Sequence, residues 1–164
     1  MRELYSSPFF VLRIDEARRI VTRARTERRF ASLEEVEAEY GSMLPVFDQV
    51  SRARFGLLVD MRLAPPRNDP AFERIVNRLY HRLYGGFREV AILVKTQAGK
   101  LQLTRVCEVN GIKAGIFLDE AAAFAHLELD HTTGERLRTG TIPPTSSSLP
   151  PTSSSNPARR VSRA

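Results

Sequence analysis

Three short apolar runs constrain the fold of this chain more than any other feature of its sequence. They are FGLLVD at 55–60, EVAILV at 89–94 and KAGIFLD at 113–119. Each is almost continuously apolar, which is typical of a strand buried on both faces of a sheet. Parallel strands need a long crossover, and the segments between these runs are long enough to supply one. The pattern predicts an open α/β sheet that is parallel in its later part.

The first connecting segment carries the start signal of a helix. Ser32 and Glu35 have the spacing of a capping box and stand ahead of an apolar stripe, which predicts a helix over 32–53. Pro45 lies inside this pattern. Because a proline removes a backbone hydrogen bond and crowds the preceding turn, we expect a kink or break near 41–44.

Three further helices are expected. Asp69 is a good N-cap, and it begins a helix that stops at two consecutive glycines, 85–86. Residues 96–111 fit a strand or a helix, and their place between two buried strands favours the helix. The last helix covers 120–129.

Two strands precede the first helix. The apolar run 9–14 and the partly alternating run 18–26 are joined by three residues, which predicts a β-hairpin. In the second run, Ile20, Thr22 and Ala24 share one face and arginines are spread over the other. The prediction is therefore an α/β domain, with an N-terminal β-hairpin followed by alternating strands and helices. Its mixed, largely parallel sheet is flanked by helices.

The chain of 164 residues has room for one domain with a sizeable core, which we place at 1–131. From Thr132 the composition changes to proline, serine and threonine, and PPTSSSLPPTSSS is a near-repeat. Such a segment has almost nothing to bury. Residues 132–164 are therefore predicted to form a disordered tail with a basic end.

Composition and cysteine content indicate the class of protein and its compartment. Hydrophobic residues make up 42% of the chain and charged residues 27%, as in soluble globular proteins. No apolar run reaches the about 18 residues of a transmembrane helix. The N-terminal segment reaches Arg13 and Asp15 too soon for a secretory signal. Cys107, the single cysteine, fits a reducing compartment, so we expect a cytoplasmic protein.

The net charge of +6 suggests a nucleic-acid partner, but its distribution argues against one. Arg159, Arg160 and Arg163, near the end of the tail, supply half of it. A nucleic-acid surface usually concentrates charge on one face, often with exposed aromatic residues. Specific nucleic-acid binding is therefore not expected.

The turn RLAPPRNDP at 62–70 is a candidate site, because strand-to-helix turns often hold phosphates or nucleophiles. It contains no glycine, and its prolines lack amide donors, so it does not fit a phosphate-binding loop. No serine, threonine or cysteine lies between Phe55 and Phe72, which excludes a nucleophile elbow. A capped helix start with stiff prolines is the favoured explanation.

No set of residues has the spacing of a catalytic or metal site. His81, His126 and His131, the only histidines, have no cysteine or acidic partners at metal-ligand spacing. Cys107 lacks a motif and is expected in the core. Carboxylate pairs such as Asp119 with Glu120 fall at turns or caps. We therefore expect no enzymatic activity, no catalytic residue, no metal and no cofactor.

The hairpin, FGLLVDMR, the turn into NDPAFERI, REVAILVKT and GIFLDEAAAFAHL together resemble the STAS-like superfamily over about residues 8–129. This superfamily includes the anti-sigma-factor antagonists of the SpoIIAA type and the CRAL-TRIO lipid carriers. The closest resemblance is to small bacterial SpoIIAA-like proteins, in which a final strand followed by Asp, Glu and an Ala-rich helix is common. The resemblance implies a regulatory or protein-interaction module without catalysis of its own.

The resemblance also points to one turn. In the antagonists, a partner kinase phosphorylates a serine or threonine at the start of the helix after the central strand, which adds nearly two negative charges. Here that position falls on Asn68 or Asp69, so the phosphorylatable residue is missing. Asp69 could imitate the modified form, but a helix cap is the simpler account. The candidate partner-recognition turn comprises Arg62, Arg67, Asn68 and Asp69.

Arginines also cluster between positions 13 and 29. Arg18, Arg19, Arg23 and Arg25 form a candidate surface for an anionic partner such as a lipid headgroup or an acidic protein. The favoured alternative is the solvated face of an edge hairpin, where charges discourage strand-to-strand aggregation.

Three functions are compatible with these patterns. We prefer a non-enzymatic, STAS-like module that binds a protein, with a kinase-like or sigma-regulating protein as the expected kind of partner. The alternative is binding of a small hydrophobic ligand or lipid headgroup, which a sizeable cavity would support and a tightly packed core would oppose. That cavity would be lined by Phe72, Leu79, Leu83 and Phe124. The third is nucleic-acid binding through the arginines. The oligomeric state stays open.

Overall fold

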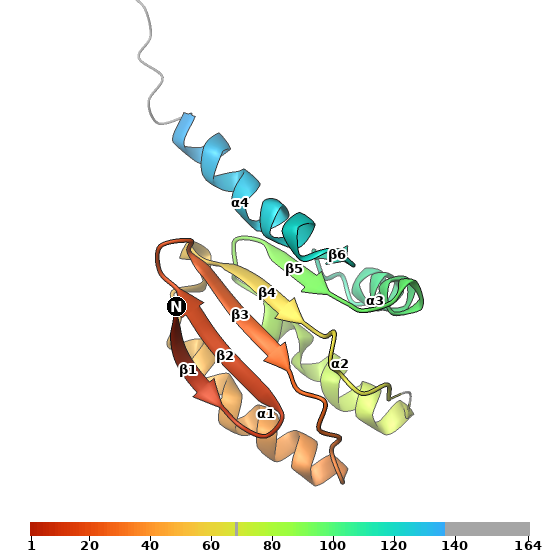
Figure 1. Cartoon of the computed structure of the whole chain (residues 1–164). Helices are drawn as coiled ribbons and strands as arrows, with labels where there is room; N and C mark the ends of the chain where they lie inside the picture. Colours follow the sequence, from red (N-terminus) through yellow and green to blue (C-terminus); the bar gives the residue numbers. More distant parts are fainter. Residues whose placement is uncertain (68, 137–164) are drawn as a thin grey trace, which may run out of the picture.

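The computed structural model describes residues 1–67 and 69–136, and these form one mixed sheet with helices on both faces (Figure 1). The strands are β1 (Arg2–Ser6), β2 (Phe10–Asp15), β3 (Ile20–Arg25), β4 (Gly56–Asp60), β5 (Val90–Leu93) and β6 (Gly115–Phe117). They lie in the sheet in sequence order. The pairs β1–β2 and β2–β3 are antiparallel, whereas β3–β4, β4–β5 and β5–β6 are parallel.

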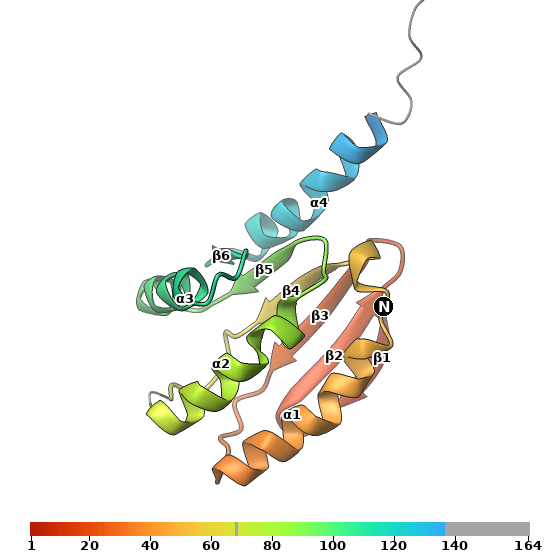
Figure 2. The same ribbon diagram turned by 180° about the vertical axis from the view of Figure 1, so that it is seen from behind.

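Each parallel pair is connected by a helix. The helices are α1 (Leu33–Asp48), α2 (Pro70–Tyr84), α3 (Gln97–Val109) and α4 (Glu120–Arg136), with a short 3₁₀ helix at Arg52–Arg54. α1, α2 and α3 connect β3 to β4, β4 to β5 and β5 to β6, and they cover one face of the sheet. α4 follows β6 and packs on the opposite face, as the two views in Figures 1 and 2 show.

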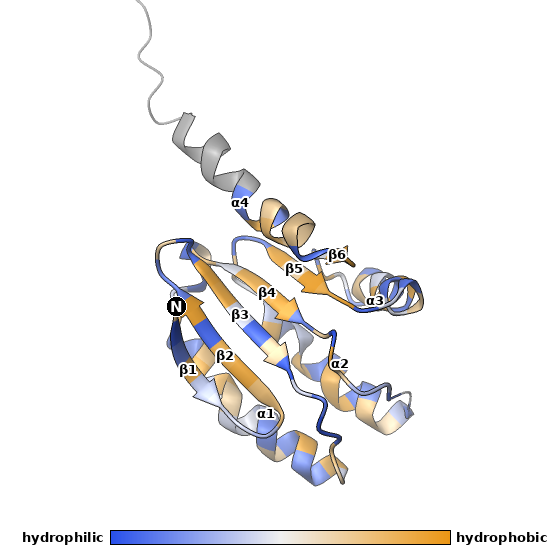
Figure 3. Ribbon diagram, viewed as in Figure 1, coloured by the Kyte–Doolittle hydropathy of each residue, from blue (hydrophilic) through white to orange (hydrophobic). Residues whose placement is uncertain are grey.

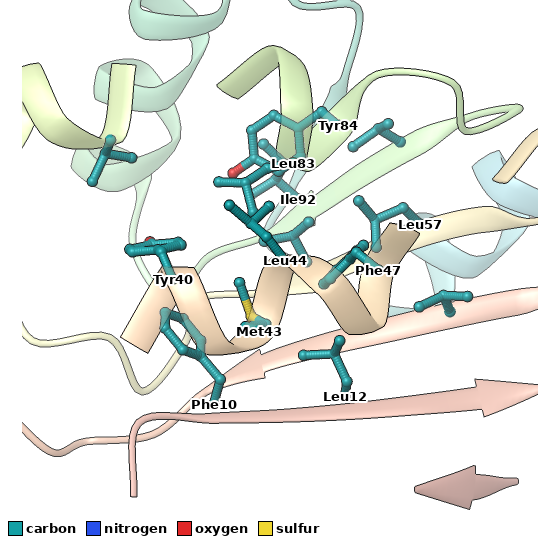
Figure 4. Packing of buried hydrophobic residues seen from close by; sticks show 14 of the residues in the cluster. Phe10, Leu12, Tyr40, Met43, Leu44, Phe47, Leu57, Leu83, Tyr84 and Ile92 are labelled. Carbon is teal, nitrogen blue, oxygen red and sulfur yellow. The ribbon is translucent and has the colours of Figure 1, made fainter. Parts of the chain in front are cut away.

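The main core lies between the sheet and the helices α1 and α2 (Figure 4). α1 contributes an apolar stripe of residues three or four apart, because side chains on one face of a helix recur at that spacing. The strands contribute alternate residues, because side chains on one face of a strand recur at every second position. The residues of this core that are labelled in Figure 4 are Phe10, Leu12, Tyr40, Met43, Leu44, Phe47, Leu57, Leu83, Tyr84 and Ile92.

A smaller core lies under α4. It joins Ala123 and Leu127 of α4 to four residues on the outward face of the strands, Ile20, Leu58, Ala91 and Leu93. α4 and β4 approach closely at Gly56. A Cβ atom added there would lie only 3.2 Å from Leu127 Cδ2. The main strand contacts of α4 are with β4, β5 and β6, and Figure 3 colours β1 largely hydrophilic and β2 largely hydrophobic.

The predicted fold class is confirmed. The hairpin and the three buried strands are present, and residues 97–109 are the helix that the crossover argument favours. β1 was not expected from the sequence. It pairs with β2 through a register shift between Glu3 and Tyr5 and lies at the edge of the sheet.

The expected break near Pro45 is wrong, because α1 runs from Leu33 to Asp48 without interruption. Pro45 has no amide hydrogen to donate to the carbonyl group of Gly41. Both residues are exposed, so this carbonyl group lies on the solvent side of the helix. The Ser32 hydroxyl accepts from the Glu35 amide as predicted, whereas the Glu35 carboxylate accepts from Ala31.

The last helix is longer than predicted. α4 continues to Arg136, past the expected helix end at 129. The remaining part of the predicted tail, residues 137–164, lies outside the described residues.

The variant Leu127→Ala tests how α4 is held. Leu127 is fully buried, and its truncation leaves a cavity between α4 and β4, so we expect a loss of about 2–5 kcal/mol in the free energy of unfolding. Val109→Ala is the matched control: its side chain is 78% exposed, and we expect a change within about 0.5 kcal/mol. Urea unfolding measures both. Equal losses in the two variants would contradict this packing.

Candidate functional site

The carboxyl ends of β4 and β6 are joined by a network of ion pairs around Arg62. Its Nη2 lies 2.7 Å from Asp60 Oδ2, and its Nε lies 3.0 Å from Asp60 Oδ1, so the pair is bidentate. Its Nη1 donates to Glu120 Oε2 at 2.9 Å. Asp60 ends β4 and Glu120 begins α4, so one guanidinium bridges two segments that are far apart in the chain.

The network fixes the charge state of Asp60. Partial burial acts to raise the pKa of this carboxyl group, but hydrogen bonds from the side chain and backbone of Arg62 outweigh it and hold the pKa below its ordinary value. The hydrogen bond and charge of Asp60 raise the pKa of Arg62 most, and those of Glu120 raise it further. Both groups therefore stay charged over the range in which proteins normally work.

A second ion pair holds the start of α2. Arg67 Nε donates to Asp69 Oδ2, and the Arg67 guanidinium lies 4.8 Å above the ring of Phe72. Asp69 Oδ1 accepts from the Phe72 amide at 2.8 Å, which is the predicted N-cap. The contact with Arg67 and then the cap lower the pKa of Asp69. Asn68 lies outside the described residues.

The structure therefore divides the predicted recognition turn. Arg62 turns toward α4, whereas Arg67 and Asp69 pair with one another next to α2. The carboxylate of Asp69 is used for capping and pairing, in agreement with the simpler account of this residue.

The four arginines of the predicted anionic-partner surface do not share a surface, and that interpretation is wrong for two of them. Arg23 and Arg25 are only 2% and 6% exposed. Their positions on β3 alternate with Ile20, Thr22 and Ala24, so both face the main core beneath α1 and α2.

The other two arginines of that set are exposed at the hairpin turn. Arg18 donates to Glu128 at 2.7 Å and lies 4.1 Å above the ring of Phe124, so it ties the hairpin to α4. Arg19 has a positive φ of 53°, which the tight turn imposes.

The sequence interpretation missed two exposed leucines beside the Arg62 network. Leu63 is 60% exposed and follows Arg62, and Leu118 is 44% exposed and stands two residues before Glu120. Each leucine therefore lies within two residues, along the chain, of a member of the Arg62–Glu120 bridge. The available signal was an isolated leucine in a polar, proline-rich turn, but nothing in the sequence indicated that Glu120 would lie near it.

The described residues do not bring together a metal site. No group of three or more His, Cys, Asp or Glu side chains among them could hold an ion. His126 lies 3.5 Å from Glu89, His81 is exposed on α2, and His131 falls where α4 side chains are not described. Burial raises the pKa of the Cys107 thiol. Within residues 1–67 and 69–136, no helix has the length and apolar character needed to cross a membrane.

Comparisons with known proteins were carried out at three levels. No protein-family model matches the chain, and neither curated proteins nor solved structures gave a match.

The variant Asp60→Asn tests the Arg62 network through pH. The pKa of Asp60 is lower in the folded chain than its unfolded value of about 3.9, so its stabilising contribution is present above that value and is lost as the pH falls through the folded-state pKa. We expect wild type to be more stable than Asp60→Asn at pH 7, and the difference to shrink on acidification. Urea unfolding along a pH series measures it, with Glu27→Gln as a control for removal of an exposed carboxylate. A difference that does not change with pH would contradict the network.

Proposed function

We propose that this chain is a non-enzymatic, STAS-like protein-interaction module that binds its partner at the carboxyl ends of β4 and β6. The observation that carries the proposal is the Arg62–Glu120 bridge with an exposed leucine on each side. We call the surface formed by Leu63, Arg62, Leu118 and Glu120 the bridge surface.

The bridge surface combines apolar and charged groups in a fixed arrangement. Leu63 and Leu118 offer apolar area that a partner can bury, and Arg62 and Glu120 offer directional hydrogen bonds at its rim. Arg62 is already held by Asp60 on its other side. A partner therefore does not have to order this side chain on binding, which lowers the entropic cost of association.

The topology supports the STAS-like part of the proposal. From β3 onward the chain forms consecutive strand–helix units whose strands lie side by side in sequence order, as the resemblance implies. The bridge surface begins directly after β4, in the same turn that precedes α2. In the antagonists that turn carries the regulatory phosphate. Here its acidic residue, Asp69, pairs with Arg67, so we propose binding without a phosphorylation switch.

No observation favours the ligand-binding alternative. A cavity lined by Phe72, Leu79, Leu83 and Phe124 would have to cross the sheet, because Phe124 packs beneath α4 and the other three pack on the opposite face. Nucleic-acid binding through the hairpin loses support as well, because Arg23 and Arg25 are buried.

Affinity capture from cells that produce the protein tests the proposal. The full chain is the bait, and the double variant Leu63→Asp with Leu118→Asp is compared with Val109→Asp, which places one such charge at an exposed residue at the end of α3. We expect a protein partner, of kinase-like or sigma-regulating type, to bind wild type and Val109→Asp and to bind the double variant at least about tenfold more weakly.

Circular dichroism and thermal unfolding establish that the three chains are equally folded. Recovery of a lipid with no protein partner, or equal partner binding by wild type and the double variant, would overturn the proposal.

A further inference from the structure

Arg23 is a fully buried cation, and within residues 1–67 and 69–136 no carboxylate forms an ion pair with it. It is 2% exposed on β3, and its Nε and Nη1 have no hydrogen-bond partner among the described residues. Its Nη2 has a weak contact with the Met61 sulfur at 3.8 Å. A buried guanidinium normally forms several strong hydrogen bonds, and leaving them unmade costs several kcal/mol in general.

The neighbouring Arg25 shows what a satisfied buried arginine looks like in the same strand. Its Nη1 donates to the carbonyl oxygens of Phe9 at 2.9 Å and Thr26 at 3.1 Å, and its Nη2 donates to that of Arg28. Both arginines face the main core on one strand. Arg25 has three backbone carbonyl acceptors, whereas Arg23 has only the Met61 sulfur and the Tyr84 side chain beside it. The missing acceptors at Arg23 are therefore a property of that position and not of β3 as a whole.

Aromatic rings surround Arg23. Its guanidinium carbon lies 5.3 Å from the ring centre of Phe10 and 5.7 Å from that of Tyr84. Figure 4 labels Phe10 of β2, Tyr40 of α1 and Tyr84 of α2 in the main core. Burial acts to lower the pKa of Arg23, but the oxygens of Tyr84 and Tyr40 outweigh it and keep the pKa above its ordinary value. The arginine is therefore charged. We call Arg23 with Phe10, Tyr40, Tyr80 and Tyr84 the Arg23 cage.

The charges around the cage are not balanced. Arg23 and Arg25 are two positions apart on the same face of β3, and they repel one another. The carboxylate that acts on Arg25 is Glu39, which accepts from Tyr5 at 3.0 Å and from Ser7. The groups that raise the pKa of Arg23 are tyrosines, and no ion pair joins Arg23 to a carboxylate among the described residues. The interior of the domain thus has an excess of positive charge, which favours an anion at the unpaired guanidinium.

We propose that the Arg23 cage is a binding site for a small oxyanion, a carboxylate or a phosphate, held by Nε and Nη1 of Arg23. Carboxylates and phosphates both carry the oxygen acceptors that a guanidinium prefers. The tyrosine hydroxyls are donors as well as acceptors, so they can turn from the arginine to the bound ion.

Tyr80 is the most accessible member of the cage. It is half-buried, and its ring stacks on that of Tyr84 with centres 5.6 Å apart. A groove of about 570 Å³ between α1 and α2 reaches Ile75 of the same core cluster, but no cage residue lines it. A small ion therefore reaches the guanidinium only if the ring of Tyr80 swings outward.

Nuclear magnetic resonance of the ¹⁵N-labelled full chain tests the proposal directly. The Nε–H signal of Arg23 is followed while sodium phosphate or sodium acetate is added, with sodium chloride at matched ionic strength as the reference. We expect a saturable shift with phosphate, acetate or both. Comparison of the two titrations shows whether the site prefers a tetrahedral oxyanion, such as phosphate, or a planar one, such as acetate. No saturable shift with either salt, or an equal shift with chloride, would overturn the proposal.

Thermal unfolding of variants gives a second measurement. We expect the unfolding midpoint of wild type to rise with the effective salt. Arg23→Met should lose this response and Arg29→Met, which removes an exposed charge near the same strand, should keep it. Arg23→Met removes an unpaired buried charge, so it should be no less stable than wild type without the anion. A response that persists in Arg23→Met would contradict the site, and the signal of wild type decides the question if that variant does not fold.

Discussion

Strand β3 is the constraint on which the rest of the domain depends, because it joins the two parts of the sheet. It pairs antiparallel with β2 and parallel with β4, so the hairpin and the strand–helix units share it. Its inner face carries Arg23 and Arg25 in a layer that is otherwise apolar. Tyr40 of α1 and Tyr84 of α2 cover Arg23 with aromatic rings. The loop after β3 covers Arg25 with a backbone carbonyl oxygen, that of Arg28. The core is thus organised around two cations.

The two faces of the sheet are covered unevenly. Three helices cover one face, whereas α4 packs on part of the other face, against β4, β5, β6 and Ile20 of β3. In open α/β sheets, ligands commonly bind at the carboxyl ends of the strands. Here Arg62 occupies that edge by pairing with Asp60 and Glu120. The edge is therefore closed by side chains, and the exposed leucines beside it are the basis of the proposed protein-binding surface.

The sequence predicted those parts of the fold that depend on local patterns. Continuous apolar runs identify the buried strands, and short-range caps such as Asp69 identify helix starts. β1 was not predictable, because RELYS has no alternation and is a strand only by pairing with β2. The burial of Arg23 was hidden for a different reason: a pattern rule counts every arginine as solvated, and only rings from other elements make its burial tolerable. The Arg62–Glu120 contact joins residues 58 positions apart, which no local pattern can reveal.

Met61 connects the two proposed sites. Its sulfur touches Arg23 Nη2 at 3.8 Å, its amide donates to Leu93 at 2.8 Å, and the next two residues, Arg62 and Leu63, belong to the bridge surface. An anion that draws the Arg23 guanidinium away from this sulfur changes the packing of Met61, the residue that precedes Arg62 in the chain. If partner affinity depends on the position of Met61, linkage requires the effect to be reciprocal, so a bound partner would change the affinity of the cage for the anion by the same factor. The absence of a phosphorylatable residue in the turn would then leave this chain with an input of another kind, an ion bound in the core and sensed through one methionine.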